Sequence, residues 1–470
     1  MQEVVITLEG ILDNKPSREA VLRNWHRFSV TGALFLLDVI SGSLHELDRT
    51  SYKAFDVLEA EDRKAALALF QEEFGASEMD EVIEDINILI HDGNLTYAEE
   101  EELVLNLPEE RNIKAMCLHA AHDCNMRCGY CFAGTGGFGG ERSLMSADIG
   151  KKALDFLFES SGHIKHLEVD FFGGEPLLNM EAVSDIVSYG KELEKIHGKY
   201  LKFTMTTNAL ALSEEIGRFL NENDISTVLS IDGRKEVHDA VRKTVSGDDT
   251  FEPILSNCKE FVASRQGEDY YVRGTYTKKN LDFSEDVLTL AEEGFKRISF
   301  EPVVAKEGSP YAINKSDLDA LSDEYDVLVT KMLDKCKADE EFNFFHFDME
   351  VAKGPCLAKR LSGCGAGAEY VAVTPDGDIY PCHQFVGDTK FKLGDVWSGI
   401  DNKEVRANFS SANIYTKENC RSCWTRFYCS GGCHANAFQF NEDILKPYEL
   451  GCEITQKRIE AALAYQALKK

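Results

Sequence analysis

Hydrophobic and polar positions follow different periods in successive parts of this chain. Near the N-terminus, three short runs rich in aliphatic and aromatic residues are separated by glycine-containing turns, and these are HRFSV (26–30), ALFLLDV (33–39) and SLHELD (43–48). Stretches of helical periodicity follow at 50–58, 61–74 and 77–93. Short strands followed by helices predict a winged-helix-like unit, with Thr50 as the cap of its first helix.

From about residue 112 to residue 305 the pattern changes to strand-like runs that alternate with amphipathic stretches. The six predicted strands are 114–120, 166–172, 201–207, 225–231, 269–276 and 297–303. The amphipathic stretches between them begin near Ser146, Asn179, Ser213, Arg234 and Asp282. Six such β-α units imply a parallel sheet, either open or curled into an incomplete barrel, with its site at the carboxyl ends of the strands.

These patterns divide the chain into five segments. After about residue 340 regular periodicity weakens and cysteines crowd together, so this region is expected to owe its fold to metal. The expected segments are an N-terminal extension (1–25), a winged-helix-like element (26–105), a partial barrel (106–340), a cysteine-rich domain (341–455) and a C-terminal helix (456–470).

Composition and charge narrow the class of protein. A chain of 470 residues that is 43% hydrophobic is expected to form several globular domains. It has neither a signal-peptide pattern nor a run of about 18 apolar residues, so we expect a cytoplasmic protein without a membrane span. The formal charge of -30 argues against nucleic acid, which needs a basic surface. In the cytoplasm, clustered cysteines among the fourteen are expected to be metal ligands or catalytic thiols rather than disulfides.

The stretch CNMRCGYCF carries three cysteines, Cys124, Cys128 and Cys131, directly after the first strand of the β-α array. Three thiolates on one loop can hold three corners of an iron-sulfur cube and leave one iron open for chemistry. The alternative is a zinc site completed by a histidine such as His119 or His122.

The C-x3-C-x2-C spacing, with a tyrosine before the third cysteine, resembles the signature of radical S-adenosylmethionine enzymes. In that family the stretch that matches GGEP, after the second strand, contacts the amino group of the cosubstrate. The resemblance implies that this amino group and the carboxylate of S-adenosylmethionine complete the open iron, and that reductive cleavage yields a 5'-deoxyadenosyl radical. The cosubstrate contacts that it implies are Tyr130, Gly173, Gly174, Glu175, Ser230 and Arg242.

Eight further cysteines follow residue 340 with a G-x4-C and a C-x2-C-x5-C-x3-C spacing. This spacing resembles the SPASM auxiliary-cluster domain of peptide-modifying radical enzymes and implies two more 4Fe-4S clusters, with two zinc sites as the alternative. One cluster would be held by Cys420, Cys423, Cys429 and Cys452. The other would be held by Cys364, Cys382 and Cys433, with Cys356 as a candidate fourth ligand. Buried or incidental thiols are expected at Cys117, Cys258 and Cys336.

After residue 25 the chain resembles maturases that install sulfur-to-carbon thioether links in ribosomally made peptides, especially those that act on cysteine-rich SCIFF (ranthipeptide) precursors. The resemblance implies an α/β fold: a partial (β/α)6 TIM-like barrel between a winged-helix-like peptide-recognition domain and a SPASM domain. It also implies a cysteine-containing precursor peptide whose leader adds a strand to the N-terminal sheet. A reductant such as flavodoxin or ferredoxin is expected as the electron donor.

Two other interpretations stay open. The first is a SPASM enzyme with a different product, such as formylglycine in sulfatases, a carbon-carbon crosslink or an epimerised residue. The leader-docking unit favours a short precursor peptide over a folded sulfatase. The second is a non-catalytic protein, either an iron-sulfur electron carrier or a zinc-stabilised peptide-binding module. A pure carrier would close every cluster, whereas the three-cysteine loop leaves one open.

Overall fold

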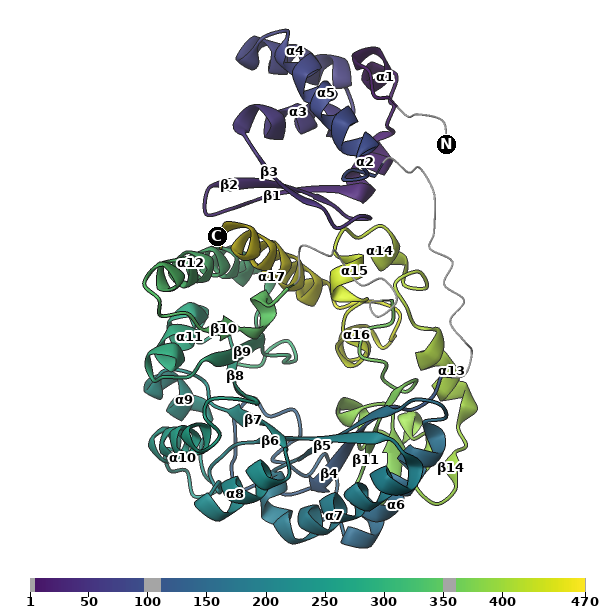
Figure 1. Ribbon diagram of the computed structural model, residues 1–470, viewed down its shortest axis with the longest axis vertical. Helices are drawn as coiled ribbons and strands as arrows, with labels where there is room; N and C mark the ends of the chain where they lie inside the picture. The colour runs from purple at the N-terminus through teal and green to yellow at the C-terminus, as the bar shows by residue number, and fades with distance from the viewer. Residues whose placement is uncertain (1–4, 97–110, 350–360, 470) are drawn as a thin grey trace.

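One large sheet runs through most of the computed structural model, which describes residues 5–96, 111–349 and 361–469. Within these residues its strand order is β10-β9-β8-β7-β6-β5-β4-β11-β12-β13-β14. A separate three-stranded sheet, β1-β2-β3, belongs to the N-terminal unit, drawn in purple at one end of the molecule (Figure 1). The α/β fold class predicted from the sequence is confirmed.

Six parallel strands form the barrel part of the large sheet, and each pairs with its successor in the chain. They are β4 (Ala115–Ala121), β5 (His166–Gly173), β6 (Tyr200–Thr207), β7 (Ser226–Ser230), β8 (Tyr270–Tyr276) and β9 (Arg297–Pro302). The helices that alternate with them are α6 (Ala147–Ser160), α7 (Met180–His197), α8 (Glu214–Glu222), α9 (Lys235–Val241), α10 (Phe251–Ser264) and α11 (Phe283–Glu292). All five helix starts expected from the sequence are N-cap residues: Ser146, Asn179, Ser213, Arg234 and Asp282.

Alternating burial along β5 shows how the sheet is held in place. Leu167, Val169 and Phe171 are at most 2% exposed and join the main hydrophobic core, while the residues between them are less buried. Fully burying a side chain of this kind contributes roughly 1.5–3 kcal/mol. The carboxyl ends of the strands are thereby fixed relative to one another.

The C-terminal domain extends the barrel sheet, because β11 (Tyr370–Val373) pairs in parallel with β4. Three antiparallel strands continue the sheet, namely β12 (Asp378–Tyr380), β13 (Gly394–Asp395) and β14 (Gly399–Ile400). At the opposite end β10 (Asn343–Phe344) pairs with β9. The helices of this domain are α13 (Lys403–Ser411), α14 (Glu418–Arg421), α15 (Arg426–Cys429) and α16 (His434–Asn441). Short 3-10 helices are η1 (Pro176–Asn179), η2 (Lys315–Asp317), η3 (Phe345–Phe347), η5 (His383–Phe385) and η6 (Thr389–Phe391).

Two long helices close the barrel on the side of the N-terminal unit. They are α12 (Leu318–Lys337) and α17 (Glu449–Leu468), which pack against each other (Figure 1). Because α17 begins at Glu449 and includes Cys452, the boundary expected between residues 455 and 456 falls inside a helix. The C-terminal helix and the cysteine-rich domain are therefore continuous.

The N-terminal unit is larger than the sequence pattern indicated. Its elements are α1 (Leu8–Leu12), α2 (Arg18–Asn24), β1 (Trp25–Val30), β2 (Ala33–Asp38), β3 (Leu44–Leu47), α3 (Arg49–Glu59), α4 (Arg63–Phe74) and α5 (Glu78–His91). Ile11 of α1 shares one core with Phe55 of α3, so the expected extension is part of this unit. The cap predicted at Thr50 is wrong, because the Asp48 side chain accepts the Ser51 N–H at 2.7 Å.

The two faces of the small sheet pack against different partners. Phe35 and Leu37 of β2 belong to the main core, whereas Leu36 between them belongs to the core of the N-terminal helices. Neighbouring residues of a strand point to opposite faces, so both faces of β2 are buried. On the main-core side, β1 lies against α17.

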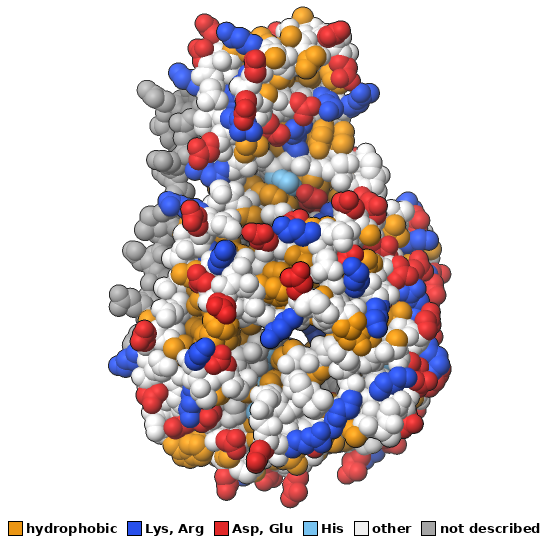
Figure 2. Space-filling view, turned by 180° about the vertical axis from the view of Figure 1, so that it is seen from behind, with side chains coloured by type: hydrophobic (Ala, Val, Ile, Leu, Met, Phe, Trp, Pro, Cys, Tyr) orange, Lys and Arg blue, Asp and Glu red, His pale blue; other side chains and the backbone are white. Residues whose placement is uncertain are grey.

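The surface carries both signs of charge. Figure 2 shows Asp and Glu side chains interspersed with Lys and Arg side chains over one whole face of the molecule. In the part of the chain that the structure describes, no helix is both long enough and apolar enough to cross a membrane.

Candidate active site

The three-cysteine loop follows β4 and is held by the last residue of α9 and the segment after it. The N–H of Arg127 donates to Lys243 O at 2.7 Å, and the N–H of Gly129 donates to Val241 O at 2.8 Å. The loop therefore lies at the carboxyl end of the barrel sheet, as the sequence predicted.

Cys124, Cys128 and Cys131 lie close enough to influence one another electrostatically. Burial is the largest cause that raises the pKa of Cys124 to about 12, and the charges of Glu175, Cys128 and Cys131 contribute to this rise. The Met126 N–H points at Cys124 Sγ from 3.4 Å, and Asn208 Nδ2 lies 3.6 Å from the same sulfur. A half-buried thiolate in this position needs a strongly positive partner, which fits iron.

Gly173 and Gly174 of the GGEP stretch pack on the backbone of the cysteine loop. A Cβ at Gly173 would lie 2.2 Å from Ala121 O, and a Cβ at Gly174 would lie 2.1 Å from Asp123 O. Gly173 also has φ +123°, which favours glycine. These glycines therefore allow a close approach between the backbones of the two loops, and this contact holds the loops together.

Glu175 is completely buried and binds protein groups with most of its acceptor capacity. Its Oε1 accepts from Thr207 Oγ1 at 2.7 Å and from the Leu177 N–H at 3.0 Å, and its Oε2 accepts from the Asn208 N–H at 2.7 Å. Burial raises the pKa of Glu175, and these hydrogen bonds oppose the shift. Since a carboxylate has about four acceptor positions, at most one remains for an ammonium, and Glu175 mainly ties the loops after β5 and β6 together.

The half-buried Tyr130 of the cysteine loop forms a polar group with the buried side chains of Asp232 and Arg242. The Tyr130 hydroxyl donates to Asp232 Oδ2 at 2.5 Å, and Arg242 Nη1 donates to the Tyr130 oxygen at 3.0 Å. Arg242 Nη1 also pairs with Asp232 Oδ1 at 3.6 Å. Among the described residues, buried Arg242 Nε has no hydrogen-bond partner. One N–H of the guanidinium is thus available to a ligand carboxylate, which fits the cosubstrate.

Sequence reasoning gave no role to Asp232, although it lies two residues after Ser230 at the end of β7. Its position is fixed from both sides: its N–H donates to His238 Nδ1 at 3.2 Å, and its Oδ1 accepts the Thr275 N–H at 3.1 Å. A polar residue at the carboxyl end of a barrel strand was the only sequence signal for it. Ser230 itself is half-buried at the same strand end.

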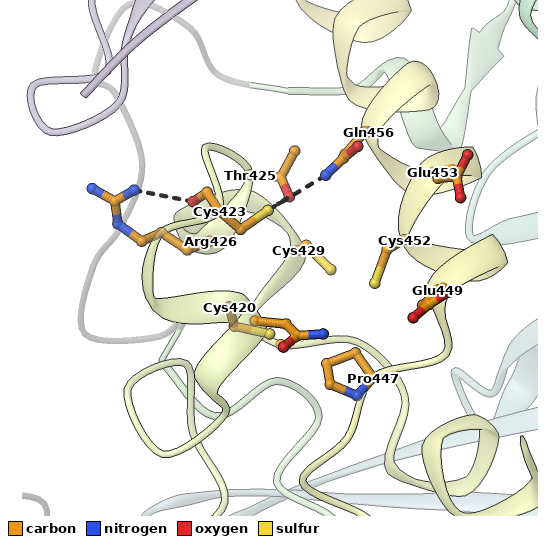
Figure 3. Close-up of a pocket in the computed structure, with 12 residues that line it drawn as sticks. Cys420, Cys423, Thr425, Arg426, Cys429, Pro447, Glu449, Cys452, Glu453 and Gln456 are labelled. Atoms are coloured by element: carbon orange, nitrogen blue, oxygen red, sulfur yellow. Dashed lines mark hydrogen bonds between the residues drawn. The ribbon is translucent and has the colours of Figure 1, made fainter. Parts of the chain in front are cut away.

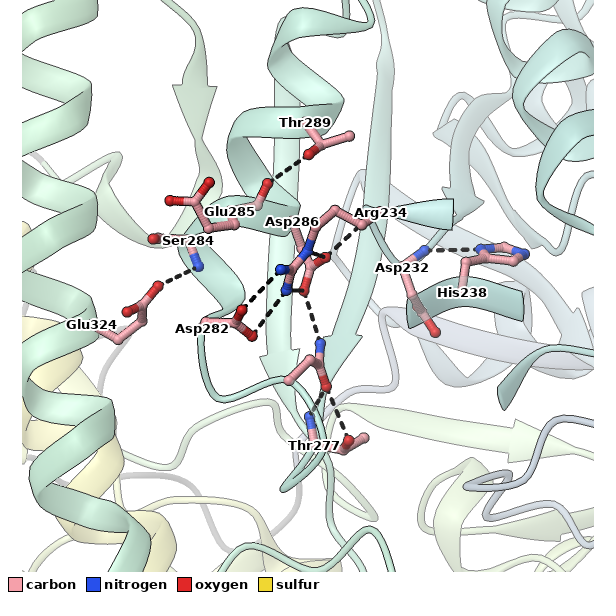
Figure 4. A network of polar contacts seen from close by, with 11 residues as sticks. Asp232, Arg234, His238, Thr277, Asp282, Ser284, Glu285, Asp286, Thr289 and Glu324 are labelled. Carbon is pink, nitrogen blue, oxygen red and sulfur yellow. Dashed lines mark hydrogen bonds and ion pairs between the residues drawn. The ribbon is translucent and has the colours of Figure 1, made fainter. Parts of the chain in front are cut away.

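A second polar network anchors the turn after Asp232 (Figure 4). Arg234 Nε donates to Asp286 Oδ1 at 2.8 Å, and its two Nη atoms donate to the oxygens of Asp282 at 2.8 and 2.9 Å. A Cβ at Gly233 would lie 2.3 Å from the Asp286 Cβ. This bidentate arginine pins the β7–α9 loop to the start of α11, so the loop that carries Asp232 is rigid.

Four thiols of the C-terminal domain surround one cavity of about 250 Å³. Figure 3 shows them around this space, with Cys429 and Cys452 pointing toward one another from α15 and α17. Gln456 Nε2 and Thr425 Oγ1 lie 3.5 and 3.0 Å from Cys423 Sγ. Four converging thiols with polar support match a fully cysteine-ligated iron-sulfur cluster. The four thiols are Cys420, Cys423, Cys429 and Cys452.

Cys364, Cys382 and Cys433 form the other late group. Burial raises the pKa of Cys382, and the charges of Cys433 and Cys364 raise it further, so the three thiols lie near one another. The structure thus places Cys433 near Cys364 and Cys382, while its role as a ligand in that group stays a prediction. Cys364 and Cys433, together with Cys429 and Cys452, line a larger cavity of about 720 Å³. Cys356 lies outside the described residues.

The zinc alternative for the first loop finds no support in the geometry. His119 Nδ1 and His122 Nε2 are hydrogen-bonded to each other at 2.9 Å. Within residues 5–96, 111–349 and 361–469, no group of three or more His, Cys, Asp or Glu side chains could hold a single metal ion. Of the three isolated cysteines, Cys117 and Cys258 are buried in the core.

Comparisons with known proteins identify two domains. Residues 114–248 match a family model described as a 4Fe-4S single cluster domain, and residues 364–424 match SPASM, an iron-sulfur cluster-binding domain. The cysteine-type anaerobic sulfatase-maturating enzyme of Clostridium novyi is 24% identical over 355 residues, which cover 69% of this chain and 89% of that protein.

Two solved structures share the fold. The structure of anSMEcpe with bound AdoMet and Kp18Cys peptide matches with a TM-score of 0.61 at 21% identity, over 74% of this chain and 97% of that one. Streptococcus suis SuiB bound to its precursor peptide SuiA matches with a TM-score of 0.51 at 19% identity, over 90% and 97%. The matched domains and fold are those of radical S-adenosylmethionine enzymes with a SPASM domain, and they imply 4Fe-4S clusters and S-adenosylmethionine as cofactors.

Proposed function

We propose that this chain is a peptide maturase that installs intramolecular thioether crosslinks, from cysteine sulfur to carbon, in a ribosomally synthesised precursor peptide. The observation that carries the proposal is the 720 Å³ cavity between the barrel and the SPASM domain, with cysteines of both auxiliary groups in its wall. A cavity of this size admits several residues of an extended peptide.

Charged side chains give the cavity a polar wall. Arg458 Nη1 of α17 pairs with Glu301 Oε2 of β9 at 3.0 Å, and His346 Nε2 lies 3.4 Å from Glu301 Oε1. Burial lowers the pKa of His346 to about 4, so its imidazole is neutral near pH 7. Carboxylate, guanidinium and imidazole together supply the acceptors and donors that a peptide backbone requires, and they would orient the core peptide.

The N-terminal unit supports a short peptide substrate with a leader. β3 pairs with β2 on one side only, within the described residues, so its other edge is open for a further strand. A groove of about 340 Å³ lies beside it, between β3 and α5, and includes Ile88 and Leu89. An open edge next to an apolar groove suits a peptide that adds one strand and inserts alternate side chains.

The roles proposed for the chain's own residues follow from the site. When bound, the reduced cluster and S-adenosylmethionine supply a 5'-deoxyadenosyl radical that abstracts a hydrogen atom from substrate carbon. Cys124, Cys128 and Cys131 would hold that cluster. Arg242 would bind the cosubstrate carboxylate, kept in place by Tyr130 and Asp232, and the auxiliary thiols would hold the remaining clusters.

The test is an anaerobic reaction with candidate cysteine-rich precursor peptides, sought among the open reading frames that neighbour this gene, followed by mass spectrometry after iodoacetamide treatment. Each thioether crosslink removes two hydrogen atoms from the peptide and makes one cysteine resistant to alkylation. A carbon-carbon crosslink loses the same mass but leaves every thiol alkylatable.

Formylglycine is the second candidate, because the Clostridium novyi relative is a sulfatase-maturating enzyme. This product loses sulfur and gains an aldehyde, which a hydrazide captures. Epimerisation changes no mass. A product with intact, alkylatable thiols and unchanged mass would contradict the thioether proposal.

A further inference from the structure

Lys417 is a buried lysine that the sequence gave no reason to notice. Its side chain is only 1% exposed, and its Nζ donates to Gly431 O at 2.7 Å. No carboxylate forms an ion pair with it within the described parts of the chain. A buried ammonium without a counter-charge is costly, so an anionic partner is expected nearby.

The loop whose carbonyl accepts the hydrogen bond from Lys417 lies between two predicted cluster ligands. Ser430, Gly431 and Gly432, which join Cys429 to Cys433, all have positive φ, at 62°, 89° and 70°. Three successive left-handed residues turn the chain sharply, so that the two cysteines face different groups of thiols. The Lys417 ammonium lies against the middle of this turn: a Cβ at Gly431 would be 3.6 Å from Nζ.

Gly431 lines both cavities of the C-terminal domain. It belongs to the wall of the 250 Å³ cavity with four thiols and to the wall of the 720 Å³ cavity, whose cysteines come from both groups: Cys364, Cys433, Cys429 and Cys452. The bond to Gly431 O therefore places the ammonium beside the turn that joins a thiol of one auxiliary group to a thiol of the other. Burial lowers the pKa of Lys417, and the thiols whose charges oppose this shift come from both groups: Cys420, Cys429, Cys433 and Cys364.

We propose that Lys417 is a positioning residue whose positive charge is shared by the two auxiliary clusters and makes both easier to reduce. A reduced cluster carries one more negative charge than an oxidised one, so a nearby cation stabilises the reduced state. A single cation beside this turn acts on both clusters at once. This role is the same whichever product the enzyme makes.

The test is an anaerobic redox titration of the holoenzyme followed by electron paramagnetic resonance. Added S-adenosylmethionine identifies the first cluster, because only that signal responds to it. At the potential that half-reduces each auxiliary cluster of the wild type, Lys417→Met is expected to lower the reduced-to-oxidised ratio of both by about tenfold, or about 59 mV for one electron. Lys417→Arg keeps the charge and is expected to keep the wild-type ratios.

Lys392→Met is the matched control, because Lys392 lies in the same domain but pairs with Asp378 at 2.6 Å on the surface. It is expected to leave all clusters unchanged. Loss of both auxiliary clusters from Lys417→Met with retention in Lys417→Arg also supports the shared charge. The proposal is overturned if one or neither auxiliary ratio changes, if the first cluster changes equally, if just one auxiliary cluster is lost, or if the arginine variant behaves like the methionine variant.

Discussion

The imidazole of His26 stacks on the indole of Trp424, with ring centroids 3.7 Å apart and planes inclined by 7°. His26 lies on β1, and Trp424 directly follows Cys423, one of the four thiols around the 250 Å³ cavity. His26 Nε2 also lies 2.8 Å from Glu460 Oε1 of α17. The N-terminal unit is therefore joined to the segment that carries an auxiliary site.

Replacing Trp424 by alanine is expected to weaken the contact between the N-terminal unit and the segment around Cys423. The stack and the apolar contact of the indole together are worth about 2 kcal/mol. Amide hydrogen exchange of β1 and β2 should therefore become faster by more than tenfold. Trp397→Ala, which removes an indole that is 59% exposed, is the control and should leave that exchange unchanged. Equal protection of β1 in the wild type and in Trp424→Ala would contradict the prediction.

The groove beside β3 predicts a variant with selective loss of peptide binding. Ile88 on α5 is 53% exposed, so Ile88→Asp should not destabilise the fold, but it introduces a charge where an apolar side chain of the leader would insert. Affinity for the precursor peptide is expected to fall at least about tenfold, since one buried apolar contact is worth 1.5–3 kcal/mol. Fluorescence anisotropy of a labelled leader measures it.

The control for the groove is Leu69→Asp on α4, where the leucine is 68% exposed and does not line the groove. Cleavage of S-adenosylmethionine without peptide should be the same in both variants. A point substitution is preferable to deleting the whole unit, because Phe35 and Leu37 of β2 share the main core. If Leu69→Asp weakened the leader as much as Ile88→Asp, the groove would not be the docking site.

The first cysteine loop is predicted to act independently of the late thiols. Substituting Cys124, Cys128 and Cys131 together by alanine should abolish 5'-deoxyadenosine formation and remove one cluster's share of iron, because a methyl group cannot hold iron. The signals of both auxiliary clusters should persist. Cys258→Ala changes a thiol that is buried alone in α10 and should retain full activity. Continued 5'-deoxyadenosine release by the triple variant would refute the assignment.

Asp232→Asn tests whether the buried carboxylate orients Arg242. The change leaves the guanidinium without its counter-charge, and a hydrogen bond to a charged group is worth about 1.5–3 kcal/mol. The affinity for S-adenosylmethionine, measured anaerobically without reductant, is expected to fall about tenfold or more. Glu214→Gln alters a carboxylate that is 89% exposed and serves as the control. An unchanged affinity in an Asp232→Asn protein with full iron content would contradict this role.

The buried His238 is expected to make the folded protein less stable at acidic pH. Its Nδ1 accepts the Asp232 N–H, and its Nε2 lies 3.0 Å from Thr250 Oγ1, whose own hydroxyl donates to Arg242 O at 2.7 Å. The imidazole is therefore neutral, with its proton on Nε2. Burial and the charge of Arg242 lower its pKa to about 3. The unfolded chain, with a pKa near 6.5, binds the proton first, so stability falls as the pH drops below about 6.5 and continues to fall toward 3.

At pH 5 this single group is expected to cost about 2 kcal/mol relative to pH 7. His238→Asn keeps an acceptor near the position of Nδ1 but does not titrate. Its midpoint of thermal unfolding should therefore depend less on pH between 7 and 5 than that of the wild type. Parallel pH profiles of the two proteins would show that His238 is not responsible.

The strands and helix starts predicted for the barrel were confirmed because they depend on local patterns. Strand runs such as 201–207 are marked by β-branched and aromatic residues, and starts such as Ser146 and Ser213 are marked by capping side chains. Long-range partners leave no such mark. The sequence around Asp232 does not predict its hydrogen bond with Tyr130, and the sequence around Lys417 does not predict its hydrogen bond with Gly431 O.

The family resemblance predicted which cysteines form each group of thiols. The structure brings the same described cysteines together. Their role as ligands stays a prediction. The sequence also could not show that α1 and α2 belong to the N-terminal unit, because their burial depends on α3 and α5 packing against them. Periodicity tells which face of a helix is buried but not what covers it.

The pairing of β4 with β11 bears on how the protein is made. Lys114, just before β4, meets Glu369, just before β11, and 255 residues of chain separate them. A ribosome adds about 5–20 residues each second. The outer edge of β4 therefore stays unpaired for on the order of ten seconds or more before β11 has been synthesised. During that time the edge offers unpaired backbone groups to other chains. Slower elongation would lengthen this exposure, and assistance by a chaperone that covers strand edges would matter most before residue 373 emerges.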